Sequence, residues 1–475
     1  MDFIGRSKEA VILEKNYNLS ESRLVVIYGR RRIGKSTLIK NFGEKKSDFY
    51  SFEAVEKLDT QSQIIHFQEQ LAKQFSDSFL PQIVFTDWTQ VFSYLTEKIV
   101  VRRSKKKVIF FFDELQWMAA GQEKLVSLIK FFWDNHWKNR NIMLILCGSV
   151  ASFMVKKVLA SNALYGRVNE EILLKGLTPP EAFLMFKNKR SFEEVLKYIM
   201  IFGTVPKYLE EIDLSKSFSQ NIEKLCFSKN GLMLNEPERI FYSQFKEART
   251  YQQIATLLKD GIFSMAEISE KLKIASGGGL KLYLDNLEHA EIIRSFIPFD
   301  KESGTKLKKF TLADEFLSFY FKYMAPNLAA IRESGSSKLF ETITRDSFDI
   351  WLGFAFERFC VKNAQLFGEL MGFNDEVLRA APYFEKGNSA FQIDLLYKRA
   401  DKVITLCEIK HYNAEITTKI IPEVERKCAL LKIPKGYTLE KALISLYGED
   451  EPLKNTGYFH HSITMKDIFK EKSNV

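Results

Sequence analysis

The first third of the chain contains four apolar runs, each of strand length. They cover residues 24–29, 48–54, 108–115 and 142–149. Continuous apolar runs are typical of parallel strands that are buried on both faces. Residues 121–139 instead space their apolar positions three and four apart, which predicts a helix with one buried stripe. Together, these patterns predict a parallel sheet wrapped by helices.

The pattern changes after about residue 176, where helical periodicity continues to about residue 260. Residues 263–316 then read as a helix, a second helix broken at Gly277 to Gly279, a third helix and two strands around the turn DKESG. This order is typical of a winged helix-turn-helix. We therefore predict five parts, which are an α/β core (1–175), a helical lid (176–258), a winged helix (259–316), a helical connector (317–344) and a second α/β domain (345–475).

Composition narrows the class of protein. No stretch approaches the roughly 18 to 20 apolar residues that span a bilayer, and the start MDFIGRSKEA lacks the apolar core of a secretory signal. The five cysteines form no CxxC pair, which is typical of free thiols in a reducing compartment. We expect a soluble, cytoplasmic protein without a membrane partner. The net charge of +9 is compatible with binding DNA and equally with a merely basic protein.

A glycine-rich motif follows the first predicted strand. GRRRIGKST opens a predicted helix and matches GxxxxGK[ST], so its backbone N–H groups can surround phosphate oxygens at a helix N-terminus. Lys35 would reach the terminal phosphates of ATP, and Ser36 would hold Mg²⁺. The alternative is a chance match to a short pattern. The predicted nucleotide-binding residues of this loop are Gly29, Arg30, Arg31, Arg32, Ile33, Gly34, Lys35, Ser36 and Thr37.

Polar residues also end two other predicted strands of the core. Asp113 would supply a carboxylate to the metal, and Glu114 would orient the attacking water, unless the pair only caps a helix. Ser149 ends the run IMLILCGS, where it would sense the γ-phosphate or cap a helix. Arg167, in LYGRVNE, is a candidate arginine finger, with a surface salt bridge as the alternative.

Several motifs occur together in the order FIGR, GRRRIGKST, FFFDELQW, LILCGS, LYGR and FGTVPKYL. In this order, residues 1 to 250 resemble the archaeal-type ATPases, a branch of the AAA-like P-loop proteins. The resemblance implies a P-loop NTPase core that binds and hydrolyses ATP. It also implies that Phe3, Ile4, Gly5 and Arg6 lie near the adenine and that Pro206 belongs to a nucleotide-sensing lid.

The last part of the chain places charged residues in apolar strands. FQIDLLYKR contains Asp394, and VITLCEIK ends in Glu408 and Lys410, which share one face of their strand. Two carboxylates from adjacent strands and a nearby lysine can hold Mg²⁺ and activate water for attack on a phosphodiester. Glu357 lies in a largely apolar helix and must be solvated, paired or bound to something. Lys427, in EVERKCALL, is a candidate for a place near the same cleft, but we expect it instead on a solvated helix face.

These residues resemble the PD-(D/E)xK nuclease superfamily, and residues 345–475 look like the uncharacterised C-terminal domain often attached to archaeal-type ATPases. The resemblance implies a restriction-endonuclease-like α/β fold. It makes Asp394 and Glu408 metal ligands, with Mn²⁺ as an alternative to Mg²⁺, gives Lys410 the role of positioning or deprotonating the water, and lets Glu357 assist the metal. A scaffold without activity and a simple exposed hairpin are the alternatives.

Two hypotheses about function follow. In the first, ATP gates binding or cutting of nucleic acid, and DNA contacts the winged helix through Lys301, Lys306, Lys308 and Lys309. In the second, the protein is an ATP-driven switch or assembly platform, its nuclease-like domain binds a partner, and its winged helix serves packing or dimerisation, as the acidic Asp285, Glu288 and Glu291 favour. A homo-oligomer is compatible with both hypotheses.

Overall fold

The computed structural model describes residues 3–101, 106–120, 124–245, 247–299, 308–333, 335, 338–385 and 390–470, without the side chains of residues 99–101. The chain divides into two compact units. The first unit contains the residues up to Leu177 and the short segment Val205–Lys207, and the second contains Thr178–Thr204 and the residues from Tyr208 onward.

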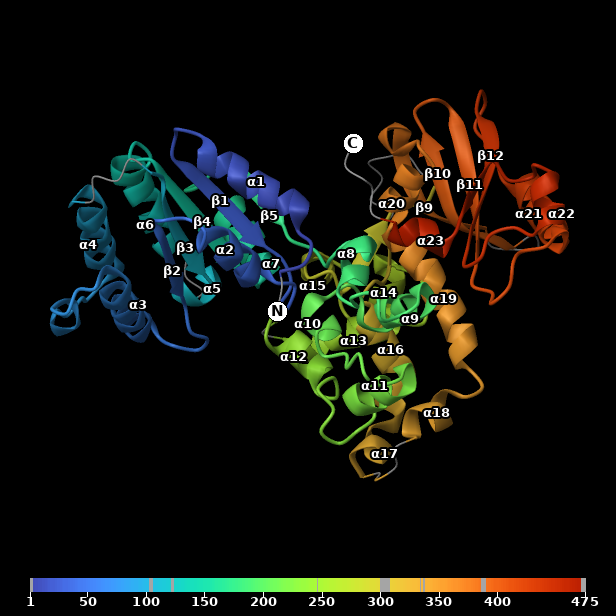
Figure 1. Cartoon of the computed structure of the whole chain (residues 1–475), viewed down its shortest axis with the longest axis horizontal. Helices are drawn as coiled ribbons and strands as arrows, with labels where there is room; N and C mark the ends of the chain where they lie inside the picture. Colours follow the sequence, from blue (N-terminus) through green and yellow to red (C-terminus); the bar gives the residue numbers. More distant parts are fainter. Residues whose placement is uncertain are drawn as a thin grey trace. The chain divides into compact units, whose positions relative to one another are not determined.

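A five-stranded sheet forms the centre of the first unit, in the order β2-β3-β4-β1-β5 (Figure 1). Every neighbouring pair in it is parallel. This confirms the predicted α/β fold with a parallel sheet. The strands are β1 (Arg23–Tyr28), β2 (Phe49–Glu53), β3 (Val108–Asp113), β4 (Ile142–Gly148) and β5 (Glu170–Leu173).

Helices cover both faces of this sheet (Figure 1). Alternate residues of a strand point to opposite faces, so Val25 and Ile27 pack with α1 and α2, while Leu24 and Val26 belong to the core with α3, α4 and α6. Both sides of the sheet are therefore buried, which explains the continuous apolar runs. The helices of this unit are α1 (Ser7–Asn18), α2 (Lys35–Gly43), α3 (Thr60–Phe75), α4 (Trp88–Val101), α5 (Leu115–Met118), α6 (Lys124–Phe132) and α7 (Ala151–Phe153).

Two local details differ from the pattern-based expectation. Strand β5 has the sequence EEIL, too short and polar to be read as a buried strand, and it forms because it pairs with the edge of β1. The helix expected over 121–139 is regular only in α6, and a π-helical segment, Trp133–Trp137, continues it.

The second unit begins with helices. Helix α10 (Pro206–Leu209) crosses the boundary between the units, and the others precede a small three-stranded antiparallel sheet of order β6-β8-β7. These helices are α8 (Pro179–Leu184), α9 (Phe192–Phe202), α11 (Phe218–Cys226), α12 (Glu236–Tyr242) and α13 (Ala248–Leu258).

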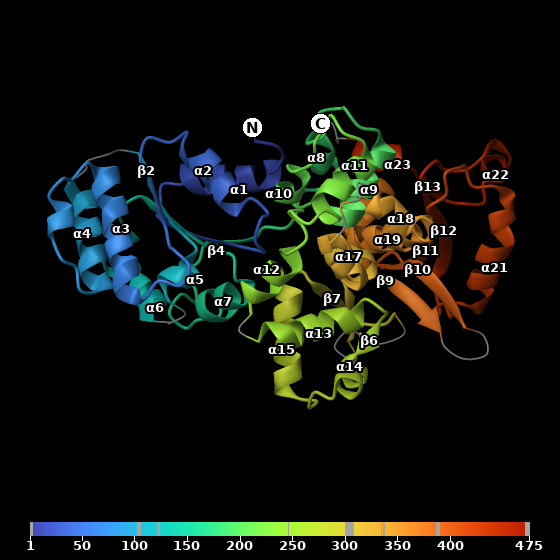
Figure 2. The same cartoon turned by 90° about the horizontal axis from the view of Figure 1, so that it is seen from below.

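Helices α13, α14 and α15 gather beside strands β6 and β7 of the small sheet (Figure 2). In chain order, this region consists of α13, β6 (Phe263–Ser264), α14 (Met265–Leu272), α15 (Gly278–His289), β7 (Ile293–Phe296) and β8 (Lys309–Leu312). Residues 263–316 thus hold two helices before the strands rather than three, because Gly277 and Gly278 begin α15 instead of interrupting a helix. Lys301 and Lys306 lie outside the described residues.

Among the described residues, α-helices connect this region to the last sheet. They are α16 (Glu315–Phe319), α17 (Leu328–Glu333), α18 (Leu339–Thr344), α19 (Phe348–Lys362) and α20 (Ala364–Leu370). Aromatic side chains join α18 to α11, because Phe340 contacts Phe218 and the adjoining Phe227, and they join α19 to α16, because Trp351 contacts Phe319. Within the described residues, no helix is both long enough and apolar enough to cross a bilayer.

A mixed sheet ends the chain, in the order β13-β12-β11-β10-β9. The pairs β9 to β10 and β10 to β11 are antiparallel, whereas β11, β12 and β13 run parallel. Helix α19 packs on β10 and β11, and α21 packs on β10. The elements are β9 (Val377–Glu385), β10 (Phe391–Arg399), β11 (Val403–Lys410), α21 (Ile421–Leu430), β12 (Thr438–Ser445), α22 (Glu451–Asn455), β13 (His461–Ile463) and α23 (Met465–Phe469).

Candidate functional site

The glycine-rich loop joins β1 to α2 and depends on two glycines with positive φ. Gly29 has φ 151°, and a Cβ there would collide with the carbonyl oxygen of Leu174. Gly34 has φ 86° and caps α2. Only glycine adopts such backbone conformations readily, so these two positions allow the loop to turn and its N–H groups to face one side.

Lys35, the first residue of α2, is buried inside this loop. Its Nζ donates to the carbonyl oxygens of Gly29 at 3.0 Å and Arg30 at 2.8 Å. The ammonium therefore lies against the backbone at the start of the loop. A phosphate oxygen is a stronger acceptor for it than a neutral carbonyl.

Ser36 and Asp113 approach each other across the carboxyl ends of the sheet. The Ser36 hydroxyl donates to the Asp113 carboxyl, which ends β3 and is almost fully buried. Burial raises the pKa of Asp113, and the nearby charge of Glu114 raises it further, while the Ser36 hydrogen bond opposes both. A hydroxyl and a carboxylate are the hard oxygen ligands that Mg²⁺ prefers.

Glu114 has φ 54° and turns away from Asp113 toward the end of β4. Its Oε2 accepts from the Ser149 hydroxyl at 2.7 Å, the Ser149 backbone N–H at 3.2 Å and Gln116 Nε2 at 2.5 Å. The structure thus brings Glu114 and Ser149 together. Helix capping was the alternative role for these side chains. No side-chain hydrogen bond caps the start of α5, which follows Glu114, or the start of α7, which follows Ser149 by two residues.

Gln116 is a residue that the sequence analysis missed. Its Nε2 also lies 3.2 Å from the Ser149 hydroxyl, and its buried Oε1 has no hydrogen-bond partner among the described residues. In the sequence, only its position two residues after Glu114, in FFFDELQW, indicates that it belongs to the site. An amide in this place can hold the Glu114 carboxylate and a water molecule at once.

The FIGR segment lies against the loop. Arg6 is buried with φ 66°, and its Nη2 donates to the carbonyl oxygen of Ile33 at 2.8 Å. Phe3 is exposed, while Ile4 and Gly5 are partly buried. Pro206 precedes Lys207, whose backbone N–H points to the Arg32 carbonyl oxygen at 3.4 Å. Both segments that the resemblance assigned to nucleotide binding therefore adjoin the loop.

The arginines of the first unit have separate surroundings. Arg30 is buried, and Arg31 lies over the Trp117 ring at 5.3 Å and 3.6 Å from Glu56. Thr37 is exposed on the first turn of α2. Arg167 forms a two-pronged pair with Asp134, at 2.8 and 2.9 Å. That pair is the salt bridge named as the alternative to an arginine finger.

Comparison with known proteins indicates the family that the first part of the chain resembles. Residues 3–212 match the model of an ATPase domain found predominantly in Archaea. This part of the chain therefore matches an archaeal-type ATPase domain. An uncharacterized protein of Methanocaldococcus jannaschii is 29% identical over 359 residues, which are 75% of this chain and 76% of that protein.

Two further proteins are similar to parts of this chain. An uncharacterized ATP-binding protein of Methanocaldococcus jannaschii is 46% identical over 44 residues, 9% of this chain and 75% of its own length. The structure of a Walker-type ATPase of Pyrococcus abyssi superposes with a TM-score of 0.50 and 19% identity, covering 67% of this chain and 96% of that one. The latter similarity shows that about two thirds of this chain shares its fold with that Walker-type ATPase.

A second acidic site lies in the last sheet, apart from the ATPase domain in the sequence. Glu408 of β11 is fully buried, and Lys427 of α21 donates to both of its carboxylate oxygens, at 3.0 and 2.7 Å. Lys410 lies 2.9 Å from Glu408 Oε1. The expectation of a solvated Lys427 is therefore wrong, because α21 turns this residue toward β11 to compensate a buried carboxylate.

Asp394 and Glu357 complete the site. Asp394 lies on β10, one position beyond the Leu395–Cys407 pair, so it adjoins Glu408 across the strands. Burial and the charge of Glu408 raise the pKa of Asp394 to about 6, and burial and the charge of Asp394 raise the pKa of Glu357 to about 7. The structure thus gathers all four predicted residues, because α19 packs against β10 and β11.

Each of the two sites offers a metal only a small set of oxygen donors. Among the described residues, no three His, Cys, Asp or Glu side chains lie close enough together to hold a cation. Mg²⁺ often takes only one or two carboxylates and completes its shell with phosphate and water. Ser36 with Asp113, and Asp394 with Glu408, fit that smaller set.

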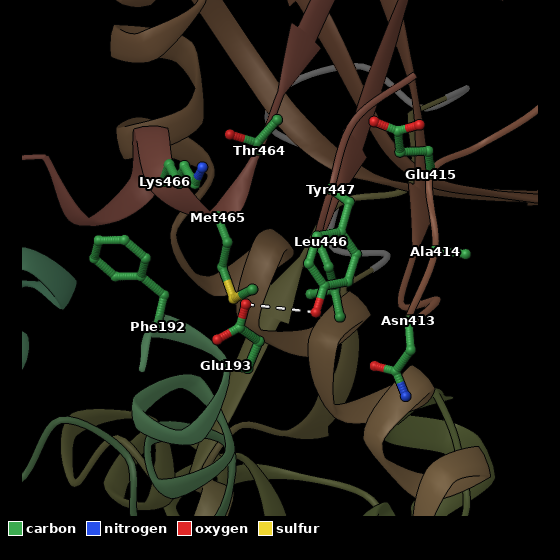
Figure 3. A pocket seen from close by; sticks show the side chains of 10 residues that line it. All are labelled: Phe192, Glu193, Asn413, Ala414, Glu415, Leu446, Tyr447, Thr464, Met465 and Lys466. Carbon is green, nitrogen blue, oxygen red and sulfur yellow. Dashed lines mark hydrogen bonds between the residues drawn. The ribbon is translucent and has the colours of Figure 1, made fainter. Parts of the chain in front are cut away.

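One cavity of about 460 Å³ lies elsewhere in the second unit, where the loops after β11 and β12 and the start of α23 face the start of α9 (Figure 3). Tyr447 and Glu193 meet in it, at 3.4 Å between hydroxyl and carboxylate oxygen. Asp394, Glu408, Lys410 and Glu357 do not line it. The cavity is therefore distinct from the acidic site.

Proposed function

We propose that the protein binds and hydrolyses ATP at the loop 29–36 and that this cycle controls a metal-dependent nuclease-like site acting on nucleic acid. The observation that carries the first half is the Ser36–Asp113 pair beside the buried ammonium of Lys35. When bound there, Mg²⁺ would neutralise charge on the transferred phosphoryl group.

The residues of this chain supply the remaining steps of ATP hydrolysis. The loop N–H groups and Lys35 hold the phosphates, and the Glu114 carboxylate accepts a hydrogen bond from the attacking water and orients it. Ser149 and Gln116, both bonded to Glu114, would hold that carboxylate in place and respond to the γ-phosphate.

Phosphate release and nucleotide retention test this half of the proposal. Wild-type protein with Mg²⁺ should retain ATP and release phosphate, and Lys35→Ala should lose both. Lys40→Ala is the matched control, since Lys40 lies on the same helix but pairs with Glu53 at the surface. Wild-type protein that retains no purine nucleotide with Mg²⁺ present would contradict the proposal.

The second half is supported by the order of elements around the acidic site. Helices α19 and α20, the antiparallel strands β9, β10 and β11, helix α21 and the parallel strand β12 follow one another, which is the order that we expect of a restriction-endonuclease-like core. Lys410 lies beside Glu408 at the end of β11, where it could position a water molecule next to two carboxylates. Asp394→Ala should abolish metal-dependent cleavage and spare ATP turnover, while Asp375→Asn, an exposed change, should leave both unaltered.

An ATP-driven switch whose second unit only binds a partner is the alternative. It would be favoured if neither DNA nor RNA in any form is cleaved and no divalent cation binds at Asp394 and Glu408. The region of α13, α14 and α15 suits packing in either case, because Lys309 pairs with Glu267 at 2.8 Å and Glu288 accepts from Ser295. Salt-dependent duplex binding that Lys308→Glu weakens would instead assign DNA contact to this winged-helix arrangement.

A further inference from the structure

The lysine of helix α21 gives the acidic site a second cation that the strand motif does not contain. Lys427 is 6% exposed, and its ammonium bridges both oxygens of a carboxylate that is itself fully buried. Lysine is rarely buried to this degree unless it is paired. Lys427 is therefore a structural part of the site and not an ordinary surface lysine.

The contacts leave Glu408 little capacity for another cation. Its two oxygens offer about four lone pairs. Lys427 uses both oxygens and Lys410 approaches Oε1, so three approaches are already taken. An ammonium 2.7 Å from Oε2 would also repel a divalent cation at the same carboxylate.

Glu423 provides the ammonium with another place to go. It lies one turn before Lys427 on α21, and its Oε1 is 3.4 Å from Lys427 Nζ and 3.5 Å from Lys410 Nζ. Its side chain is much more exposed than that of Glu408. Both lysines can therefore shift toward Glu423 without any change in the helix.

We propose that Lys427 is a built-in counter-cation that competes with divalent metal for Glu408, and that Glu423 receives it when metal binds. This inference rests on the metal site of the proposed function. It makes Lys427 a positioning residue that regulates metal affinity. At low metal concentration, Lys427 would stay paired with Glu408. A movement of α21 would change the affinity of the site for divalent metal.

Calorimetric titration of the full chain with Mn²⁺ alone, without nucleotide, tests the competition. Lys427→Met should bind Mn²⁺ about tenfold more tightly, because one competing charge is removed while Lys410 still pairs with Glu408. Glu423→Gln should bind Mn²⁺ more weakly, since the lysine loses its alternative acceptor. Lys432→Met is the matched control, because Lys432 is 80% exposed and pairs with Glu385, and it should bind as the wild type does.

Glu423→Gln keeps the test decisive if Lys427→Met fails to fold, because it leaves every partner of Glu408 in place. Equal Mn²⁺ affinity in Lys427→Met, Glu423→Gln and wild type would overturn the role of Lys427, and the metal site itself would stand if Asp394→Ala then abolished that binding. Absence of Mn²⁺ binding in both wild type and Lys427→Met would overturn the metal site and this inference together.

Discussion

Two groups of acidic residues lie on central strands of this protein or directly after one, and their partners differ in charge. Asp113 and Glu114 are hydrogen-bonded by neutral groups, the hydroxyls of Ser36 and Ser149 and the amide of Gln116. Glu408 is instead enclosed by two ammonium groups. The ATPase domain thus keeps its negative charge available for a cation that arrives with the nucleotide, whereas the second site already balances its charge internally.

The largest expected effect concerns Glu114, whose side-chain partners are neutral. Glu114→Gln should bind ATP but lower phosphate release about a hundredfold or more, because an amide cannot orient the attacking water as a carboxylate does. Single-turnover measurement of phosphate release, with nucleotide retention measured in parallel, gives the result. Glu69→Gln, an exposed change on α3, is the control, and undiminished turnover in Glu114→Gln would remove Glu114 from this role.

The next largest effect is a difference in unfolding free energy between a variant of one site and a variant of the other. Glu408→Gln should lower the free energy of unfolding of the second unit by about 3 kcal/mol, because it removes the closer and fully buried of the two carboxylates that pair with the buried Lys427. Asp113→Asn should cost the ATPase domain nothing and even stabilise it, since burial disfavours the charged form of Asp113.

Hydrogen exchange of β3 and β11 peptides across a urea series reports each unit separately. Equal losses in the two variants would mean that the different charges of their partners have no energetic consequence.

The third effect is a dependence on pH at Glu357 and Asp394. Their folded pKa values, about 7 and about 6, lie above the ordinary values of 4.5 and 3.8, so between these limits the folded protein holds protons that the unfolded chain has released. Their contribution to stability is therefore greatest at low pH and falls as the pH rises to about 7.

Glu357→Gln should remove on the order of 2 kcal/mol of this variation. Urea unfolding at pH 5, 6, 7 and 8 measures it, with Asp375→Asn as the exposed control. A Glu357→Gln variant whose stability follows the same pH curve as the wild type would show that Glu357 is not the group that titrates.

The smallest effect concerns Arg167. Arg167→Ala should cost about 0.5 kcal/mol, because its pair with Asp134 is partly exposed to solvent, and should leave ATP turnover unchanged. Asp134→Asn removes the same pair while keeping the arginine. Turnover that falls in Arg167→Ala but not in Asp134→Asn would identify an arginine finger instead.

Much of the ATPase domain could be read from the chain. The apolar runs predicted four of the five strands, because strands buried on both faces need continuous apolar sequence, and the loop motif followed the first of them directly. Gln116 could not be assigned, because glutamine carries no pattern of its own and acquires a role only where the turn after β3 brings it to Ser149. Strand β5 depended likewise on pairing with β1.

In the second acidic site, sequence supplied the residue types and the strands that carry them, since alternation along β11 alone puts Glu408 and Lys410 on one face. Only the tertiary structure decided that Lys427, seventeen residues after Lys410, turns inward to Glu408. A helix has a polar side and a buried side, and the sheet against which α21 packs determines which lysine must neutralise the buried carboxylate.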